Sequence, residues 1–212
     1  VDLLINAGAA VIGCSVSNAS NGVKQLCTLS SKGPVCQAVT TGIGNLKLLW
    51  DAGTSGLTCQ FDGQVAVVTG VTKPVGGTIM MRANVPTSGD TVQYNVDNLD
   101  LKMGPIGAAP APPTLTDFLE PFNGGVINGA VFGAPFIEKN LAVTQNNVLQ
   151  IGGTTNGAGA SANLATTGTV NTNNNTNLSA DIVFTSTVAG DPVSVDLLIN
   201  AGAAVIGCSV SN

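Results

Sequence analysis

Five cysteines are the residues whose type and spacing point most directly to chemistry: Cys14, Cys27, Cys36, Cys59 and Cys208. Cys27 and Cys36 flank a Lys-Gly-Pro turn at residues 32–34, so we expect them to face each other across a β-hairpin. Cys59 is then left to pair with Cys14 or with Cys208. Disulfides of this kind indicate an oxidising, extracellular setting. Buried free thiols are the alternative interpretation of the same residues.

Metal binding and catalysis find little support in the other reactive residues. The chain has no histidine, which removes the commonest general base and the commonest metal ligand. The cysteine spacings contain no C-x-x-C pair, which argues against a zinc site. Asp97, Asn98 and Asp100 offer oxygen atoms to a calcium ion, but they lack the spacing of a calcium loop, and a solvated strand edge explains them equally. We predict no catalytic residue, no metal and no cofactor, hence no enzyme.

Three N-x-[ST] sequons, which begin at Asn18, Asn174 and Asn177, are candidate glycosylation sites. Chance matches to so short a motif are expected in a chain rich in Asn, Ser and Thr. The pair at 174 and 177 lies in what we expect to be a surface loop. Glycans there would solubilise a surface that carries few charges.

The composition predicts a protein built mostly of β-strands. Only 9% of the 212 residues are charged and 4% are aromatic, whereas about 25% are charged in ordinary globular proteins. Val and Thr favour strands, and Gly and Asn favour turns. Seven scattered basic residues and a net charge of −5 argue against nucleic-acid binding. The apolar stretch at 126–137 is too short and too rich in glycine to span a membrane.

Alternating apolar patterns between turn-rich segments predict the strands that would position these residues. Residues 114–125 are expected to begin as a helical turn, residues 104–113 to form an extended linker, and residues 154–177 to be a flexible linker, a polar edge strand or a glycosylated loop. We therefore predict an all-β or β-dominated antiparallel sandwich or barrel-like domain, completed by a donated terminal strand, with at most one or two short helices. The strands are expected at 35–41, 46–50, 57–70, 77–85, 91–103, 141–145, 147–152 and 180–190.

Residues 195–212 repeat residues 1–18 without one difference. Residues 1–194 thus define one structural unit, and 195–212 are the start of the next unit or a donated strand. Apolar residues alternate through the segment, which predicts one long extended strand. Its apolar face consists of Val195, Leu197, Ile199, Ala201, Ala203 and Val205, and of the copies Val1, Leu3, Ile5, Ala7, Ala9 and Val11.

Exact identity indicates a segment that is needed in two places. A window on a tandem array, a strand appended to complete the fold, and a strand that belongs to a neighbour in a filament all meet that requirement. A domain that lacks a strand can take one from the next copy, and this head-to-tail contact grows a filament because it does not close. A disulfide from Cys59 to a donated Cys208 would lock the joint.

On these terminal segments and this composition, the chain resembles strand-complemented pilins and extracellular threads of bacteria and archaea. The resemblance implies a structural subunit of an extracellular or cell-surface filament, with identical neighbouring subunits as its partners and a role in adhesion or surface architecture. Residues 98–153 resemble the bactericidal/permeability-increasing type of lipid-binding domain, in which a strand, a long amphipathic helix, a proline-containing turn and two strands follow one another. That resemblance implies the alternative, an extracellular lipid- or hydrophobic-ligand-binding module, although here Pro121 and a Gly-Gly pair split the short helical part.

Overall fold

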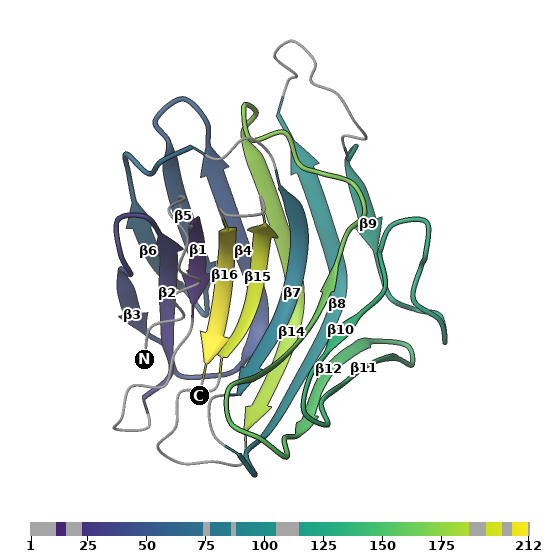
Figure 1. Cartoon of the computed structure of the whole chain (residues 1–212). Coiled ribbons are helices and arrows are strands. Elements are labelled where there is room, and N and C mark those ends of the chain that lie inside the picture. Colours follow the sequence, from purple (N-terminus) through teal and green to yellow (C-terminus); the bar gives the residue numbers. More distant parts are fainter. Residues whose placement is uncertain are drawn as a thin grey trace.

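A computed structural model describes residues 12–15, 23–73, 77–85, 88–104, 115–186, 194–200 and 205–211 (Figure 1). Of β1 (Ile12–Ser15) and β16 (Val205–Ser211) it describes the backbone alone. Every regular element in these ranges is a β-strand, and the strands pair antiparallel, so the prediction of a β-dominated sandwich is confirmed. No helix capable of crossing a membrane occurs in the ranges given above.

The large sheet forms one layer of the sandwich, and all its strand pairs are antiparallel. The short strand β9 (Phe118–Glu120) pairs with β8 outside the main order. In that order the sheet runs β11 (Ala142–Gln145), β12 (Leu149–Thr154), β8 (Thr91–Met103), β14 (Thr176–Ser186), β4 (Ile43–Asp51), β5 (Gly56–Phe61) and β6 (Gln64–Val68).

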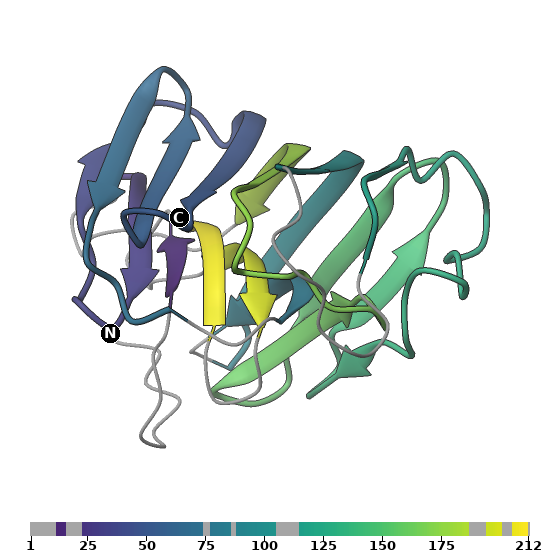
Figure 2. The ribbon, with the colours of Figure 1, turned by 90° about the horizontal axis from the view of Figure 1, so that it is seen from above.

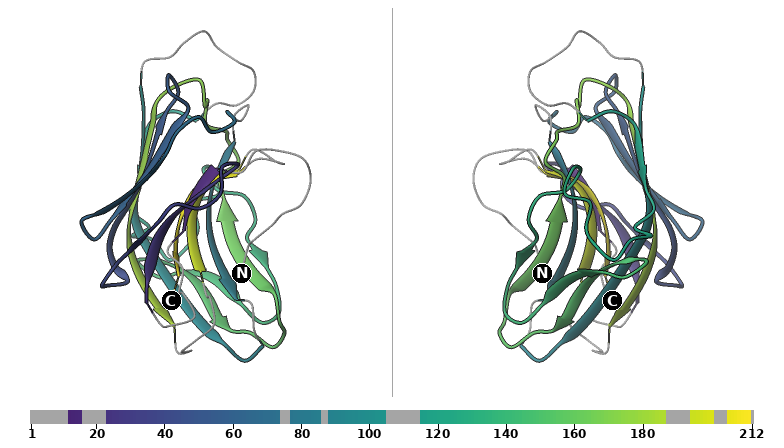
Figure 3. Two further views of the ribbon diagram at one scale, coloured as in Figure 1. Left: turned by 90° about the vertical axis from the view of Figure 1, so that its left-hand side faces the viewer. Right: turned by 90° about the vertical axis from the view of Figure 1, so that its right-hand side faces the viewer.

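The second layer faces the large sheet across the core (Figure 3). At one side it is built from β10 (Phe136–Ile137), β13 (Ala160–Ala165) and β7 (Thr78–Val85). At the other side it contains β2 (Gln25–Ser30), with the short β3 (Cys36–Ala38) beside it. Between these two parts lie β15 (Ser194–Asn200) and β16 (Figures 1 and 2). The terminal segment thus joins two parts of a layer that would otherwise be separate.

Alternation along β8 shows how the sequence forms the core. Val92, Tyr94 and Val96 are fully buried, and the buried set then shifts by one residue to Leu99 and Leu101. The shift coincides with the positive φ of 49° at Asn98 and with a register change in the pairing to β14. One extra residue in a strand reverses the side-chain alternation, which is the signature of a β-bulge.

Two predicted elements differ from the structure for local reasons. The single strand expected at 57–70 is a hairpin of β5 and β6, because Asp62 and Gly63 adopt positive φ angles of 50° and 71° and make a two-residue turn. The helical turn expected at 114–125 is wrong, since residues 115–123 contain β9 and no helix.

The low-complexity tract is the third correction. Residues 154–177 contain β13, whose Ala160, Ala162 and Leu164 are fully buried. β13 has β10 on one side and β7 on the other, so it is neither a flexible linker nor an edge strand. Small apolar side chains at every second position suffice to pack this strand against the core. The linker expected at 104–113 lies, apart from Gly104, outside the described residues.

Gly152 in β12 supports a prediction about the sheet. Its φ is +143°, and a Cβ atom there would stand 2.1 Å from the carbonyl oxygen of Val92 on β8. Gly152→Ala is therefore expected to lower the free energy of unfolding by about 3 kcal/mol or more, measured by urea denaturation. Gly125→Ala is the control, because a Cβ atom at Gly125 would meet nothing within 4 Å. Equal stability of the two variants would contradict this account of β12.

Candidate functional site

The candidate functional site is the slot between β7 and β2, which in this structure holds the hairpin of β15 and β16. Seen from above, the hairpin lies between the purple strands at the start of the chain and the teal β7 (Figure 2). β16 pairs antiparallel with β2, and β15 lies beside β7. Without an occupant, the facing edges of β7 and β2 would expose unpaired backbone N–H and C=O groups.

The occupant is a hairpin, not the single extended strand expected from its alternation. β15 pairs antiparallel with β16 from Ser194 opposite Ser211 to Asn200 opposite Val205. Val205 therefore does not continue the row of Val195, Leu197 and Ile199 in an unbroken strand. Two shorter strands fill a gap two strands wide, whereas one long strand would fill half of it.

Three residues of the predicted inserted face anchor the occupant. Val195, Leu197 and Ile199 each have 0% exposure and belong to the main hydrophobic core. Burying such a side chain stabilises a fold by about 1.5–3 kcal/mol, so the three together contribute roughly 5–9 kcal/mol. Ala201, Ala203 and the copies between Val1 and Val11 lie outside the described residues.

Both copies of the repeated segment pair with the same strand in the same register. β1 belongs to the first copy and β16 to the second, and each pairs antiparallel with β2. The coincidence covers three positions: Gly13 and Gly207 are opposite Leu29, Cys14 and Cys208 are opposite Thr28, and Ser15 and Ser209 are opposite Cys27. β1 also pairs with β15 at Asp196, the residue that Ser209 of β16 faces, so the two copies have the same neighbours on both sides.

Only one edge of β2 is open to these two strands. Thr28 donates its backbone N–H to the carbonyl oxygen of Val35, 2.9 Å away, on the side of β3. Successive residues of an antiparallel strand direct their hydrogen-bonding groups to opposite edges. Cys27 and Leu29 therefore address the other edge, toward the slot. Since that edge can pair with one strand at a time, β1 and β16 are alternative partners for it.

Disulfide-bonded cysteines occur in the layer that contains the slot and in the large sheet opposite it. Cys27 and Cys36 are bonded at 2.03 Å between β2 and β3, which confirms the predicted hairpin bridge. Cys59 in β5 of the large sheet is fully buried and is also disulfide-bonded. The partner of Cys59 is not among the side chains that the structure describes, and the same holds for the side chains of Cys14 and Cys208.

Two exposed carboxylates, Asp51 and Asp62, stabilise turns and strand ends. A hydrogen bond from the Thr54 hydroxyl lowers the pKa of Asp51, and one from the Thr40 hydroxyl lowers the pKa of Asp62. These carboxylates hold the turn after β4 and the segment before it. Both groups are exposed and neither faces a reactive side chain.

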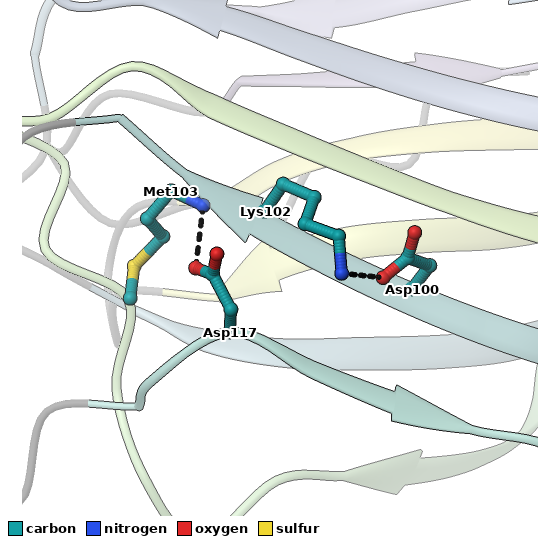
Figure 4. Close-up of polar contacts among 4 residues, drawn as sticks. All are labelled: Asp100, Lys102, Met103 and Asp117. Carbon is teal, nitrogen blue, oxygen red and sulfur yellow. Dashed lines mark hydrogen bonds and ion pairs between the residues drawn. The ribbon is translucent and has the colours of Figure 1, made fainter.

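The acidic residues singled out as calcium ligands are engaged with their neighbours. Asp100 forms an ion pair of 2.9 Å with Lys102, and this hydrogen bond raises the pKa of Lys102 (Figure 4). Asp97 accepts the backbone N–H of Asn98 at 2.8 Å, and Asp117 accepts that of Met103 at 2.8 Å. Within the described ranges, no group of three His, Cys, Asp or Glu residues is arranged to hold a metal ion.

The sequons differ in accessibility. Asn174 is 3% exposed, so its amide is shielded in the folded chain and the expected surface loop is wrong at this residue. Asn177 is exposed on β14. Asn18 lies outside the described residues. Asn177 is therefore the one described sequon that a glycosylating enzyme could reach after folding.

Two surface hollows occur among the described residues. One, of about 200 Å³, lies between β8 and β12, and the other, of about 480 Å³, lies at the ends of β4, β8 and β14. The larger hollow has Asp51 and Lys102 in its lining, but Asp51 is hydrogen-bonded to Thr54 and Lys102 is paired with Asp100. No known protein-family model matches the chain, and the curated proteins include no similar sequence.

The strand β2 borders the candidate site, and the sequence interpretation missed it. No strand was expected at residues 25–30, although the predicted pairing of Cys27 with Cys36 requires extended backbone on both sides of the turn. That requirement was the available signal. Leu26, Cys27 and Thr28 are all buried, so β2 lacks the clean alternation that identified strands such as β8.

Proposed function

We propose that the chain is a structural subunit of an extracellular filament or tandem-repeat fibre, in which the eighteen-residue segment is shared between successive units. The slot of one unit holds the segment that begins the next unit. The observation that carries this proposal is the identical register of the two copies on one edge of β2. A segment that is present twice and has one place to bind is what head-to-tail assembly by strand donation requires.

Binding of one unit's segment in another unit's slot can build a filament. The segment and the slot are different surfaces of the same unit, so each contact leaves one segment and one slot free at the two ends. Such a heterologous contact grows without closing unless its rotation forms a ring. Because the two copies are identical, moving from one occupant to the other changes no contact inside the slot. A chain can fill its slot with its own segment or with that of a neighbour. The ratio of the two states depends on protein concentration and on the length of chain that links each copy to the domain.

The cysteines and the surface support an extracellular setting. The Cys27–Cys36 disulfide favours an oxidising compartment. The large sheet presents Asn177 outward and only 9% of the chain's residues are charged, which suits a glycosylated fibre at the cell surface. In this setting the filament would serve adhesion or surface architecture, with identical neighbours as its partners.

Strand donation is tested by adding the segment to the full-length chain as a fluorescent synthetic peptide of residues 1–18. We expect the labelled peptide to replace a copy in the slot, to shorten fibres seen by negative-stain electron microscopy, and to co-elute with the chain in size-exclusion chromatography. A peptide of the same composition in scrambled order is the control. A chain that forms no fibres at any concentration and takes up no peptide would refute the proposal.

A further inference from the structure

We propose that Cys59 is a covalent acceptor site for the slot's occupant, and that subunits join by thiol–disulfide exchange at this one sulfur atom. This inference rests on the proposed filament function and adds a chemical step to it. The incoming copy supplies a thiol and the copy already in the slot leaves as a thiol. Each slot therefore keeps one disulfide between Cys59 and its occupant.

The cysteine inventory identifies the partners of Cys59. Cys27 and Cys36 hold each other, and Cys59 is itself disulfide-bonded. The chain has five cysteines, so within one chain the partner is Cys14 or Cys208. These two residues occupy identical eighteen-residue sequences and have the same Cα partner on β2, Thr28. Whichever copy fills the slot therefore has its cysteine backbone opposite Thr28.

The position of Cys59 fits a bond that crosses the sandwich. Cys59 lies in β5 between Leu48 of β4 and Ala66 of β6, and its side chain is fully buried. β1 and β2 pack against β5, and β16 packs against β4. A disulfide from Cys59 to the occupant thus ties the slot layer to the large sheet. Its burial keeps bulk thiols away until an occupant begins to leave.

The exchange balances without any external oxidant. The thiolate of an incoming Cys14 attacks the sulfur of Cys59, and a new S–S bond forms as the bond from Cys59 to Cys208 breaks. Cys208 leaves as a thiolate and takes up the proton that Cys14 gave up. One disulfide and one thiol are present before and after the step. An odd number of cysteines per chain supplies the free thiol that each new joint needs.

The test compares Cys14→Ser with Cys208→Ser, the same substitution in identical surroundings at the two ends of the full-length chain. Assembled samples are alkylated and run on non-reducing gels. The unsubstituted chain is expected to give a ladder of covalent oligomers that a reductant collapses to monomer. Cys14→Ser abolishes the ladder, because the donated copy then brings no thiol. Cys208→Ser alone also forms no ladder, because Cys59 is then bonded to Cys14 of its own chain and no free thiol remains. A trace of small-molecule thiol releases Cys14 and restores the ladder in Cys208→Ser but not in Cys14→Ser.

Isotope mixing identifies the bond between chains. Equal amounts of unlabelled and ¹⁵N-labelled chain are assembled and digested with trypsin, which releases residues 1–24 and residues 48–82. Mixed-isotope pairs of these peptides are expected, since they report a bond from Cys14 of one chain to Cys59 of another. Fibres without a covalent ladder, or a ladder unaffected by Cys14→Ser, would overturn the exchange and leave the filament standing. Absence of fibres would overturn the proposed function itself.

Discussion

A chain of residues 19–194, which lacks both copies of the segment, is expected to remain unfolded until a peptide of residues 1–18 is added. The missing occupant takes with it the burial of Val195, Leu197 and Ile199, roughly 5–9 kcal/mol. Domains are stable by about 5–15 kcal/mol in total, so the loss removes most or all of that margin. It also exposes the edges of β7 and β2 to water and to other chains.

Fluorescence of Trp50 measures the outcome directly. Trp50 is the single tryptophan, is 2% exposed and donates its indole N–H to the carbonyl oxygen of Thr172 at 2.9 Å. We expect a red-shifted, water-like emission from residues 19–194 alone and a native emission once the peptide binds. A peptide with Asp in place of Leu3 and Ile5 is the control and should not restore the spectrum. A truncated chain that melts at the temperature of the full-length chain without any peptide would contradict the role of the slot.

Much of the large sheet was predictable because its strands carry their own patterns. β8 was expected at 91–103 and occupies Thr91–Met103, since polar and apolar residues alternate along it and turns flank it. β7 was expected at 77–85 and occupies Thr78–Val85, whereas β14 was expected at 180–190 and begins four residues earlier, at Thr176. The hairpin of β11 and β12 was expected from the turn at Asn146, and β12 pairs with β11 as anticipated. In these cases local sequence and tertiary packing favour the same conformation.

The hairpin in the slot was missed although its sequence carried the signal. Apolar residues occupy odd positions through Val195, Leu197 and Ile199, then even positions at Ile206, Cys208 and Val210. A change of phase beside Gly202 marks two strands with a turn between them. The interpretation as one extended strand was wrong because it counted the alanines in the turn as a continuation of the odd-numbered apolar row. The prediction for β13 was wrong for a related reason. Its alanine and asparagine residues are typical of linkers, and only packing against the core distinguishes it as a strand.

The shared edge of β2 could not be predicted from a single sequence. The repeat shows that a segment exists twice, but the number of places that accept it is a property of the folded layer. That number emerges from the direction in which Thr28 donates its N–H group, which leaves Cys27 and Leu29 to face the slot. Because the chain has two possible occupants and one slot, the effects of substitutions in the two copies on the free energy of unfolding should not be additive.

Leu3→Asp and Leu197→Asp, each alone, are expected to lower the free energy of unfolding by about 1 kcal/mol or less. An unpaired carboxylate in the core is costly, but the unaltered copy can take the slot in its place. The double variant has no good occupant left and is expected to lose about 4 kcal/mol or more, far beyond the sum of the single effects. Urea denaturation followed by Trp50 fluorescence, with a reductant present so that no disulfide holds either copy, measures all three.

Leu46→Asp is the matched control for this pair. Leu46 is also fully buried, in β4, and its strand has no second copy in the chain. The single substitution there should be as damaging as the double substitution in the two segments, because nothing can replace the altered strand. If Leu197→Asp alone were as damaging as Leu46→Asp, the first copy would be unable to enter the slot. The two segments would then not be interchangeable, and the basis for exchange between subunits would be lost.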